Sequence, residues 1–240
     1  MSHPSPTTLP LTLRPSSDAD LPAIADIYGW NVRHGTGTFE LDAPSVADMT
    51  VRRQEVLSRS LPWLVAEREG QVLGYAYANY FRPRMAYRFA LEDSIYLAPS
   101  AQGQGVGTLL LDELIRQCQA LGARQMLAVI GDSANQGSIR LHAKAGFEAT
   151  GVMRSVGWKF ERWLDVVMMQ RALGPGSRSA TRHSRFCSSP CSSSACHSSG
   201  PRLLQPCHAA CPDGLGLPSA PAPACSAWSR STTCRDGEWT

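Results

Sequence analysis

The chain has 240 residues with a formal net charge of +3. Six basic and three acidic residues follow position 173, which leaves 17 of each sign before it. The neutral first part argues against nucleic-acid binding by bulk electrostatics. No run of 18 apolar residues and no signal peptide are present, so we expect a soluble cytoplasmic protein without a membrane segment.

Composition divides the chain into three parts. We expect a flexible N-terminus over residues 1–10, a folded domain over 11–173 and a disordered Ser/Pro/Cys-rich tail over 174–240. Seven of the eight cysteines lie in the tail, and only Cys118 lies in the domain, which favours a disulfide-free domain. The tail spacings C-x3-C and C-x4-C are poor for zinc, so no metal is expected and an unselected or frame-shifted extension is favoured.

The first 81 residues predict a strand, two helices and a hairpin. A short strand begins at Leu11, and Ser17 with Asp20 forms a capping-box pattern before apolar residues at helical spacing. The same start signal, at Ser45 and Asp48, precedes a second helix that runs to about Arg59. Residues 63–81 alternate around Glu69-Gly70, as two hairpin strands do.

The rest of the domain predicts strands and helices in alternation. Strands are expected at 90–100, 125–131, 147–157 and 162–173, and helices from about 106 to 122 and over 135–146. An antiparallel meander followed by strand–helix–strand units indicates a mixed central sheet with helices on both faces. The expected fold is a three-layer α/β/α sandwich.

Residues 102–107 place three glycines at alternate positions before the predicted helix at 106. A phosphate-binding P-loop is excluded because no Lys-Ser or Lys-Thr follows, and the spacing G-x-G-x-G does not fit a dinucleotide fingerprint. Two interpretations stay open on this segment alone. It is either a tight turn between strand and helix or a cradle of backbone N–H groups for a pyrophosphate.

A resemblance to a known family separates these alternatives. The pattern Q-x-x-G-x-G at 102–107 resembles the acyl-coenzyme A loop of the GCN5-related N-acetyltransferase (GNAT) superfamily. Residues 135–147 resemble the family's N-x-x-[AS]-x-x-L-[YH]-x-x-x-G-[FY] helix. Across 11–173 the chain is similar to the subgroup that acetylates phosphinothricin and methionine sulfoximine or sulfone.

The resemblance implies the acyl-CoA N-acyltransferase fold, acetyl-CoA as co-substrate and a set of residues that bind it. The end of one strand would pair its backbone with the pantetheine arm, the glycine segment would bind the pyrophosphate, and the next helix would contact the pantetheine. In that order the residues are Ile95, Tyr96 and Leu97; Gln102, Gly103, Gln104, Gly105, Val106, Gly107 and Thr108; and Asn135 and Ser138.

Two residues are candidates for the proton transfers of an acetylation. By resemblance Glu92 is the general base that takes a proton from the incoming amine; alternatively it is an ordinary acid at a strand end. His142 stands where many relatives carry a tyrosine that protonates the leaving thiolate. It is either that general acid or a helix residue that packs near the co-substrate.

The expected acceptor is a small amino-acid-like molecule. Arginine is suited to a carboxylate or phosphinate, and the resemblance points to substrate contacts by Arg82, Arg84, Tyr87 and Phe39. A solvated basic loop and a core aromatic residue are the alternatives. Glu161 stands where the subgroup would have glycine, which predicts a residue with positive φ.

The resemblance further implies a homodimer, with the N-terminal helices near the partner's active site. Alternative functions are acetylation of protein N-termini, which needs an open peptide groove, and catalytically silent binding of acyl-CoA.

Overall fold

The computed structural model describes residues 10–179. The predictions for residues 1–9 and for most of the tail, including its disorder and the zinc alternative, lie outside these residues. The domain boundary near residue 174 stays a prediction.

Residues 10–179 contain seven strands and four α-helices in the predicted order. The first part comprises β1 (Thr12–Pro15), α1 (Leu21–His34), α2 (Val46–Ser58), β2 (Trp63–Arg68), β3 (Gln71–Tyr80) and β4 (Ala90–Leu97). The second comprises α3 (Val106–Ala120), β5 (Gln125–Gly131), α4 (Gln136–Lys144), β6 (Glu148–Lys159) and β7 (Arg162–Ala172). Three single 3-10 turns, Asp18–Asp20, Met85–Tyr87 and Pro99–Ala101, connect these elements.

The strands form one mixed sheet in the order β1-β2-β3-β4-β5-β7-β6. Its one parallel pair, β4 with β5, extends only from Ala90 to Asp93 on β4. Beyond Asp93, β4 stays paired with β3 as far as Leu97, and β5 stays paired with β7 as far as Gly131. The two central strands therefore separate after Asp93, and one backbone edge of each is left without a strand partner at the opening.

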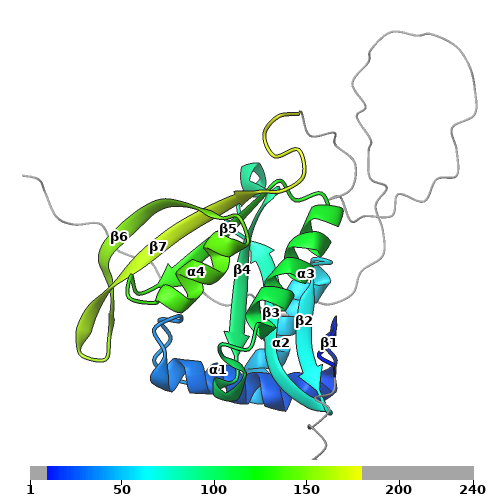
Figure 1. Ribbon diagram of the computed structural model, residues 1–240, viewed down its shortest axis with the longest axis vertical. Coiled ribbons are helices and arrows are strands. Elements are labelled where there is room, and N and C mark those ends of the chain that lie inside the picture. Colours follow the sequence, from blue (N-terminus) through cyan, green and yellow to red (C-terminus); the bar gives the residue numbers. More distant parts are fainter. Residues whose placement is uncertain (1–9, 180–240) are drawn as a thin grey trace, which may run out of the picture. The chain divides into compact units, whose positions relative to one another are not determined.

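Helices cover both faces of the sheet, which confirms the predicted three-layer sandwich. Figure 1 shows α3 and α4 on the near face and α2 behind the strands. On the α1 side the sheet presents stacked rings: Trp63 and Tyr77 have centroids 4.3 Å apart, and Tyr28 of α1 meets Tyr96 edge-on at 4.7 Å. On the other side α3 buries Leu110, Leu111 and Leu114 completely. Burial of these apolar surfaces is the main stabilising contribution to the domain.

The first helix begins later than the capping pattern predicts. Asp20 does accept a hydrogen bond from the Ser17 backbone N–H, at 2.7 Å, but residues 18–20 form a 3-10 turn and α1 starts at Leu21. Pro22 has no N–H, so the α-helical bond back to Asp18 cannot form. The second helix follows the prediction, because Ser45 Oγ accepts from the Asp48 N–H at 3.2 Å and Asp48 bonds back to the Ser45 N–H.

Two hairpins turn through pairs of left-handed residues. Glu69 and Gly70 have φ of 54° and 77°, and Phe160 and Glu161 have φ of 51° and 56°. Two consecutive positive φ values define the type I′ turn, whose twist matches that of the flanking strands. The prediction of a positive φ at Glu161 is confirmed, and this turn is made without glycine.

Candidate functional site

The glycine segment before α3 carries several backbone N–H groups without hydrogen-bond acceptors among residues 10–179. Gly103 and Gly105 have φ of 73° and 80°, and a Cβ built on either would meet no atom within 4 Å. Helix α3 has no side-chain cap. Among residues 10–179, no acceptor is found for the N–H groups of Gly103, Gly105, Val106 or Gly107. Such donors at a helix N-terminus form a site for an anion, aided by the helix dipole.

The third glycine of the segment has a different role. Gly107 lies inside α3 and is buried. A Cβ at this position would meet Leu97 and Leu141 side-chain atoms at 3.4 Å. Gly107 therefore packs against β4 and α4, where a Cβ would make ordinary van der Waals contacts, while Gly103 and Gly105 leave open space. Gln102, Gln104 and Thr108 are exposed around this space.

The end of β4 forms one wall of the opening between β4 and β5. Ile95, Tyr96 and Leu97 pair with β3 on one side, and on the other side they have no strand. Asn31 of α1 donates a hydrogen bond from Nδ2 to the Leu97 carbonyl oxygen, at 3.3 Å. An unpaired strand edge of this kind is suited to main-chain hydrogen bonding with an extended amide-bearing ligand.

Helix α4 begins beside the opposite wall. Asn135 caps it, because its Oδ1 accepts from the Ser138 N–H at 3.3 Å. Both side chains are half-buried. A Cβ on Gly37, in the loop between α1 and α2, would lie 3.7 Å from Asn135 Nδ2. The start of α4 and this loop are thus neighbours.

Glu92 lies on β4 two residues before the opening and is half-buried. Its position alternates with that of Asp93, so the two side chains point to opposite faces of the sheet. Burial raises the pKa of Glu92, the negative charge of Asp93 raises it further, and the Arg82 guanidinium lowers it. A carboxylate with a raised pKa is a better proton acceptor near neutral pH than an exposed one.

His142 is buried between α4 and β4. Its Nε2 lies 2.9 Å from Asp93 Oδ2 and its Nδ1 lies 2.8 Å from the Ser138 carbonyl oxygen. The ring also meets Phe147 edge-on, with centroids 5.1 Å apart. Both nitrogens are therefore engaged by the protein.

The predicted substrate residues are only partly brought together. Arg82 lies over the Phe81 ring, with its Cζ 4.2 Å from the centroid, and it is close enough to lower the pKa of Glu92. Arg84 and Tyr87 are exposed on the same connection, where Tyr87 packs edge-on against Phe81 at 5.9 Å. No contact of Arg84 or Tyr87 with Glu92 is found in the part of the chain that the structure describes.

Phe39 lies away from the arginine loop, against the ends of β5 and β6. Its ring occupies the space above Gly131 and Gly157, where a Cβ on either glycine would clash with it. The loop that carries Phe39 is fixed by Lys159, whose buried Nζ donates to the carbonyl oxygens of Gly35 and Thr38 at 2.9 and 2.8 Å. Phe39 thus helps to attach the α1–α2 loop to the sheet near the opening.

Sequence reasoning missed two contributors to this region. Asn31 has no sequence signal, since an asparagine in a helix is common and its contact with Leu97 spans 66 positions. Asp93 is the neighbour of the candidate base Glu92 in the sequence. Its pairing with His142 spans 49 positions and depends on the packing of α4 on β4, so no local pattern indicates it.

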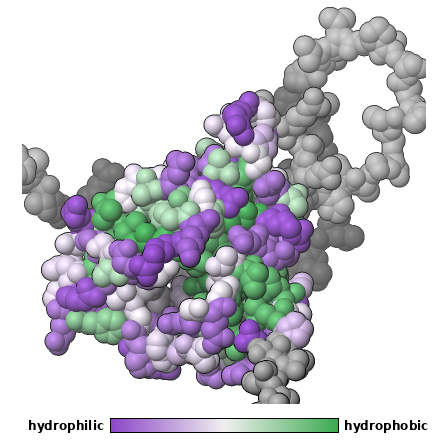
Figure 2. All heavy atoms as spheres, viewed as in Figure 1, coloured by the Kyte–Doolittle hydropathy of each residue, from purple (hydrophilic) through white to green (hydrophobic). Residues whose placement is uncertain are grey.

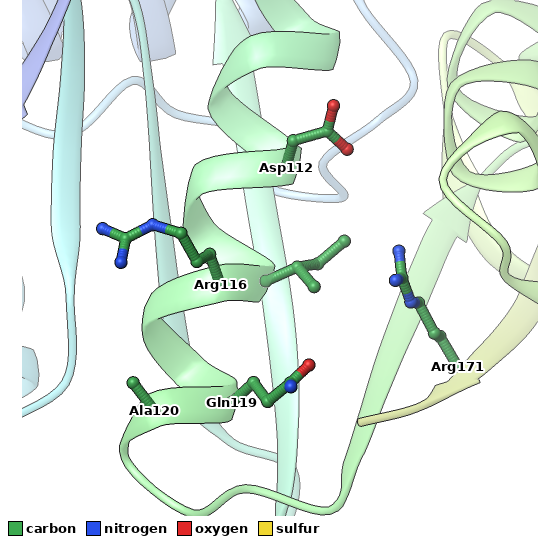
Figure 3. A pocket seen from close by; sticks show the side chains of 6 residues that line it. Asp112, Arg116, Gln119, Ala120 and Arg171 are labelled. Carbon is green, nitrogen blue, oxygen red and sulfur yellow. The ribbon is translucent and has the colours of Figure 1, made fainter. Parts of the chain in front are cut away.

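A separate pocket lies beside the C-terminal half of α3. Residues of α3 and Arg171 of β7 line it, and Asp112 and Gln119 lie on the side of α3 toward Arg171 (Figure 3). It lies more than a helical turn beyond the glycine segment and contains none of the predicted site residues. Within residues 10–179 no group of three metal-ligating side chains is found, and no helix is long and apolar enough to span a membrane.

Comparison with known proteins places these features in a family. The model of the acetyltransferase (GNAT) family matches residues 26–147. A phosphinothricin N-acetyltransferase of Alcaligenes faecalis is 50% identical over 186 residues, which cover 73% of this chain and 94% of the relative. An L-methionine sulfoximine/L-methionine sulfone acetyltransferase of Pseudomonas aeruginosa is 38% identical over 70% of this chain and 98% of its own length.

A solved structure agrees with these relatives. The GNAT superfamily phosphinothricin acetyltransferase from Sinorhizobium meliloti, crystallised in complex with acetyl-CoA, has a TM-score of 0.71 and 47% sequence identity. The similarity covers 72% of this chain and 94% of that one. With its sheet opening, its glycine segment and these relatives, the chain belongs to the acetyltransferase (GNAT) family.

Proposed function

We propose that this enzyme transfers the acetyl group of acetyl-CoA to the α-amino group of a small amino-acid-like substrate that carries an acidic or oxidised side chain. Phosphinothricin and methionine sulfoximine or sulfone represent the substrate class. The observation that carries the proposal is the half-buried Glu92, with a raised pKa, beside the opening between β4 and β5.

The residues around the opening fit acetyl-CoA. The unpaired N–H groups of Gly103, Gly105, Val106 and Gly107 would bind the pyrophosphate, with Gln102, Gln104 and Thr108 around it. The free edge of β4 from Ile95 to Leu97, with Asn135 and Ser138 across from it, would bind the pantetheine. The bound thioester supplies the acetyl group, which passes to the amine nitrogen as the carbon–sulfur bond breaks.

The protein's part in the reaction is to prepare the amine and to stabilise charge. An amino group arrives as an ammonium and becomes nucleophilic when Glu92, directly or through a water, removes a proton. Arg82, with Arg84 and Tyr87 on the same connection, would hold the acidic group of the substrate. Phe39 would limit the site from the α1–α2 loop. His142 acts either as a general acid or as a positioning group, and its two engaged nitrogens support the second role.

The test is release of free thiol from acetyl-CoA by the purified full chain. The acceptors are phosphinothricin, methionine sulfoximine, methionine sulfone, ordinary amino acids and a short peptide. We expect turnover with the first three, and none with N-acetylated methionine sulfone, which lacks the free amine. Turnover of the peptide alone would favour a protein N-terminal acetyltransferase. Binding of acetyl-CoA without any turnover would favour the non-catalytic alternative.

We also propose that the enzyme is a homodimer and works in the cytoplasm. The edge strand β6 and the tip of the β6–β7 hairpin expose six large apolar side chains by 45 to 61%: Val152, Met153, Val156, Trp158, Phe160 and Trp163. Figure 2 shows apolar residues on the side of the molecule where Figure 1 places this hairpin. Apolar patches of this kind mark association surfaces. The buried free thiol of Cys118 suits a reducing compartment.

Light scattering tests the association. We expect a mass of two chains for the wild type and of one chain for the double variant W158S/W163S. Leu41→Ser, which changes an exposed apolar residue elsewhere, is the control and should leave the mass unchanged.

A further inference from the structure

Asp93 lies where β4 and β5 separate. It is the last residue of β4 that pairs with β5, opposite Ala128. Its side chain is 2% exposed and that of His142 is 5% exposed, so the pair is removed from water. The neighbouring Glu92 lies on the other face of the strand.

The short contacts of the two His142 nitrogens fit one protonation state, and the longer contact of Nδ1 with Ser138 Oγ, at 3.4 Å, is compatible with it. The Ser138 carbonyl oxygen can only accept, so the contact at 2.8 Å requires a proton on Nδ1. An ionised Asp93 carboxylate can only accept, so the contact at 2.9 Å pairs its Oδ2 with a proton on Nε2. A ring that donates from both nitrogens is an imidazolium, paired here with a carboxylate.

The surroundings agree with a charged ring. Burial lowers the pKa of His142, but the hydrogen bond and charge of Asp93 and the Ser138 carbonyl raise it, and the net direction is upward. From α3, Cys118 faces Asp93, and burial together with that carboxylate raises the pKa of the thiol to about 12, so the thiol stays neutral.

His142 pairs with only one of the two oxygens of the Asp93 carboxylate. Its Oδ1 is buried and has no hydrogen-bond partner among residues 10–179. Burial is the main cause that raises the pKa of Glu92. The negative charge of Asp93 raises it further, and Arg82 lowers it. One carboxylate thus acts on groups on both faces of β4.

We propose that Asp93 is a positioning residue for acetyl transfer, which holds His142 as an imidazolium where β4 and β5 separate. The inference rests on the proposed function of this site. A fixed cation at the opening stabilises the negative charge that develops as the thioester is attacked.

The first test needs no turnover. Nitrogen NMR of the histidine rings, with the His142 signals assigned through His142→Gln, reports the protonation of each ring nitrogen. We expect both nitrogens of His142 to be protonated at pH 7 in the wild-type chain. In Asp93→Asn the ring should lose a proton at a pH at least one unit lower. A neutral ring in the wild type at pH 7 would overturn the proposal, whether or not Asp93→Asn folds.

The second test is the pH dependence of kcat/KM for the amine. Removing the Asp93 charge lowers the pKa of Glu92 and of His142, so both the acidic and the basic limb should move to lower pH by about one unit. His142→Gln should lose the basic limb and keep the acidic one. Asp20→Asn is the matched control, since Asp20 is a buried carboxylate that pairs with Arg14 away from β4.

The outcomes separate this inference from the proposed function. A lower rate in Asp93→Asn with both limbs unmoved would show that Asp93 is only structural. If no acceptor is turned over, the proposed function fails, while the NMR result still decides the state of His142.

Discussion

The polar groups at the corner between β1 and α1 have hydrogen-bond partners, whereas several of those at the opening between β4 and β5 have none among residues 10–179. At the corner Arg14 donates to both carboxylate oxygens of Asp20, at 2.7 and 2.8 Å, and to Glu67 at 2.8 Å. At the opening Oδ1 of Asp93 and the N–H groups of Gly103, Gly105, Val106 and Gly107 lack partners in this described part of the chain. Paired charges stabilise the fold, whereas buried or backbone groups left without partners mark a candidate site.

The contrast predicts that Glu92→Gln abolishes activity and spares the fold. We expect kcat to fall by about 100-fold or more, the range for loss of a general base. Stability at pH 7 should hold or rise slightly, because the raised pKa means that folding disfavours the charged form of Glu92. Thiol release and denaturant unfolding measure the two effects. Glu113→Gln, at an exposed pair with Arg116, is the control, and equal rates for all three proteins would contradict the base role.

Asp20→Asn should show the reverse pattern. The hydrogen bonds from Arg14 lower the pKa of Asp20 from 3.8 to about 2. A shift of that size corresponds to roughly 2 kcal/mol of stability, present above about pH 4 and lost as the pH falls through about 2. Urea unfolding from pH 7 to pH 2 should show a difference from wild type that shrinks with acid. A difference in stability that does not change with pH, or a loss of kcat, would contradict a purely structural role for the Asp20–Arg14 pair.

Gly105→Ala tests whether the open space at the glycine segment is a binding site. We expect the KM for acetyl-CoA to rise about tenfold, as for the loss of a charge-assisted hydrogen bond of roughly 1.4 kcal/mol. Gly70→Ala is the matched control, because Gly70 has a similar φ of 77° and equally free surroundings in the β2–β3 turn. Both variants carry backbone strain of roughly 1 kcal/mol. Equal KM values for Gly105→Ala and Gly70→Ala would show that the glycine segment is a turn that does not bind acetyl-CoA.

Glu161→Gly gives the size of such strain at a place outside both regions. Glu161 has φ of 56° in the β6–β7 turn, where glycine costs less than a side chain. We expect stability to rise by about 0.5 kcal/mol, measured by thermal unfolding, with kcat unchanged. A loss of stability would mean that the strain inferred for Gly105→Ala is too large.

Much of this fold could be predicted from the order of residues. Ser45 with Asp48 predicted the start of α2, Glu69-Gly70 predicted a hairpin turn, and the glycines at 103 to 107 predicted a turn or an anion cradle before α3. These signals are local, because capping, turn chemistry and hydrophobic period act over a few residues. The late start of α1 is also a local effect, because Pro22 at the second helical position has no N–H for an α-helical bond.

The residues of the candidate site also divide into those that local patterns predict and those that only long-range contacts reveal. The sequence by itself determined which segments carry acetyl-transfer motifs, because the glycine loop and the Asn135 helix are short patterns with a fixed backbone conformation. Only the tertiary structure decided that Gly107 serves packing, that Phe39 lies against Gly131 and Gly157, and that Asp93 pairs with His142. Such contacts join residues far apart in the chain, and they form only when helices dock on a sheet whose central strands separate after Asp93.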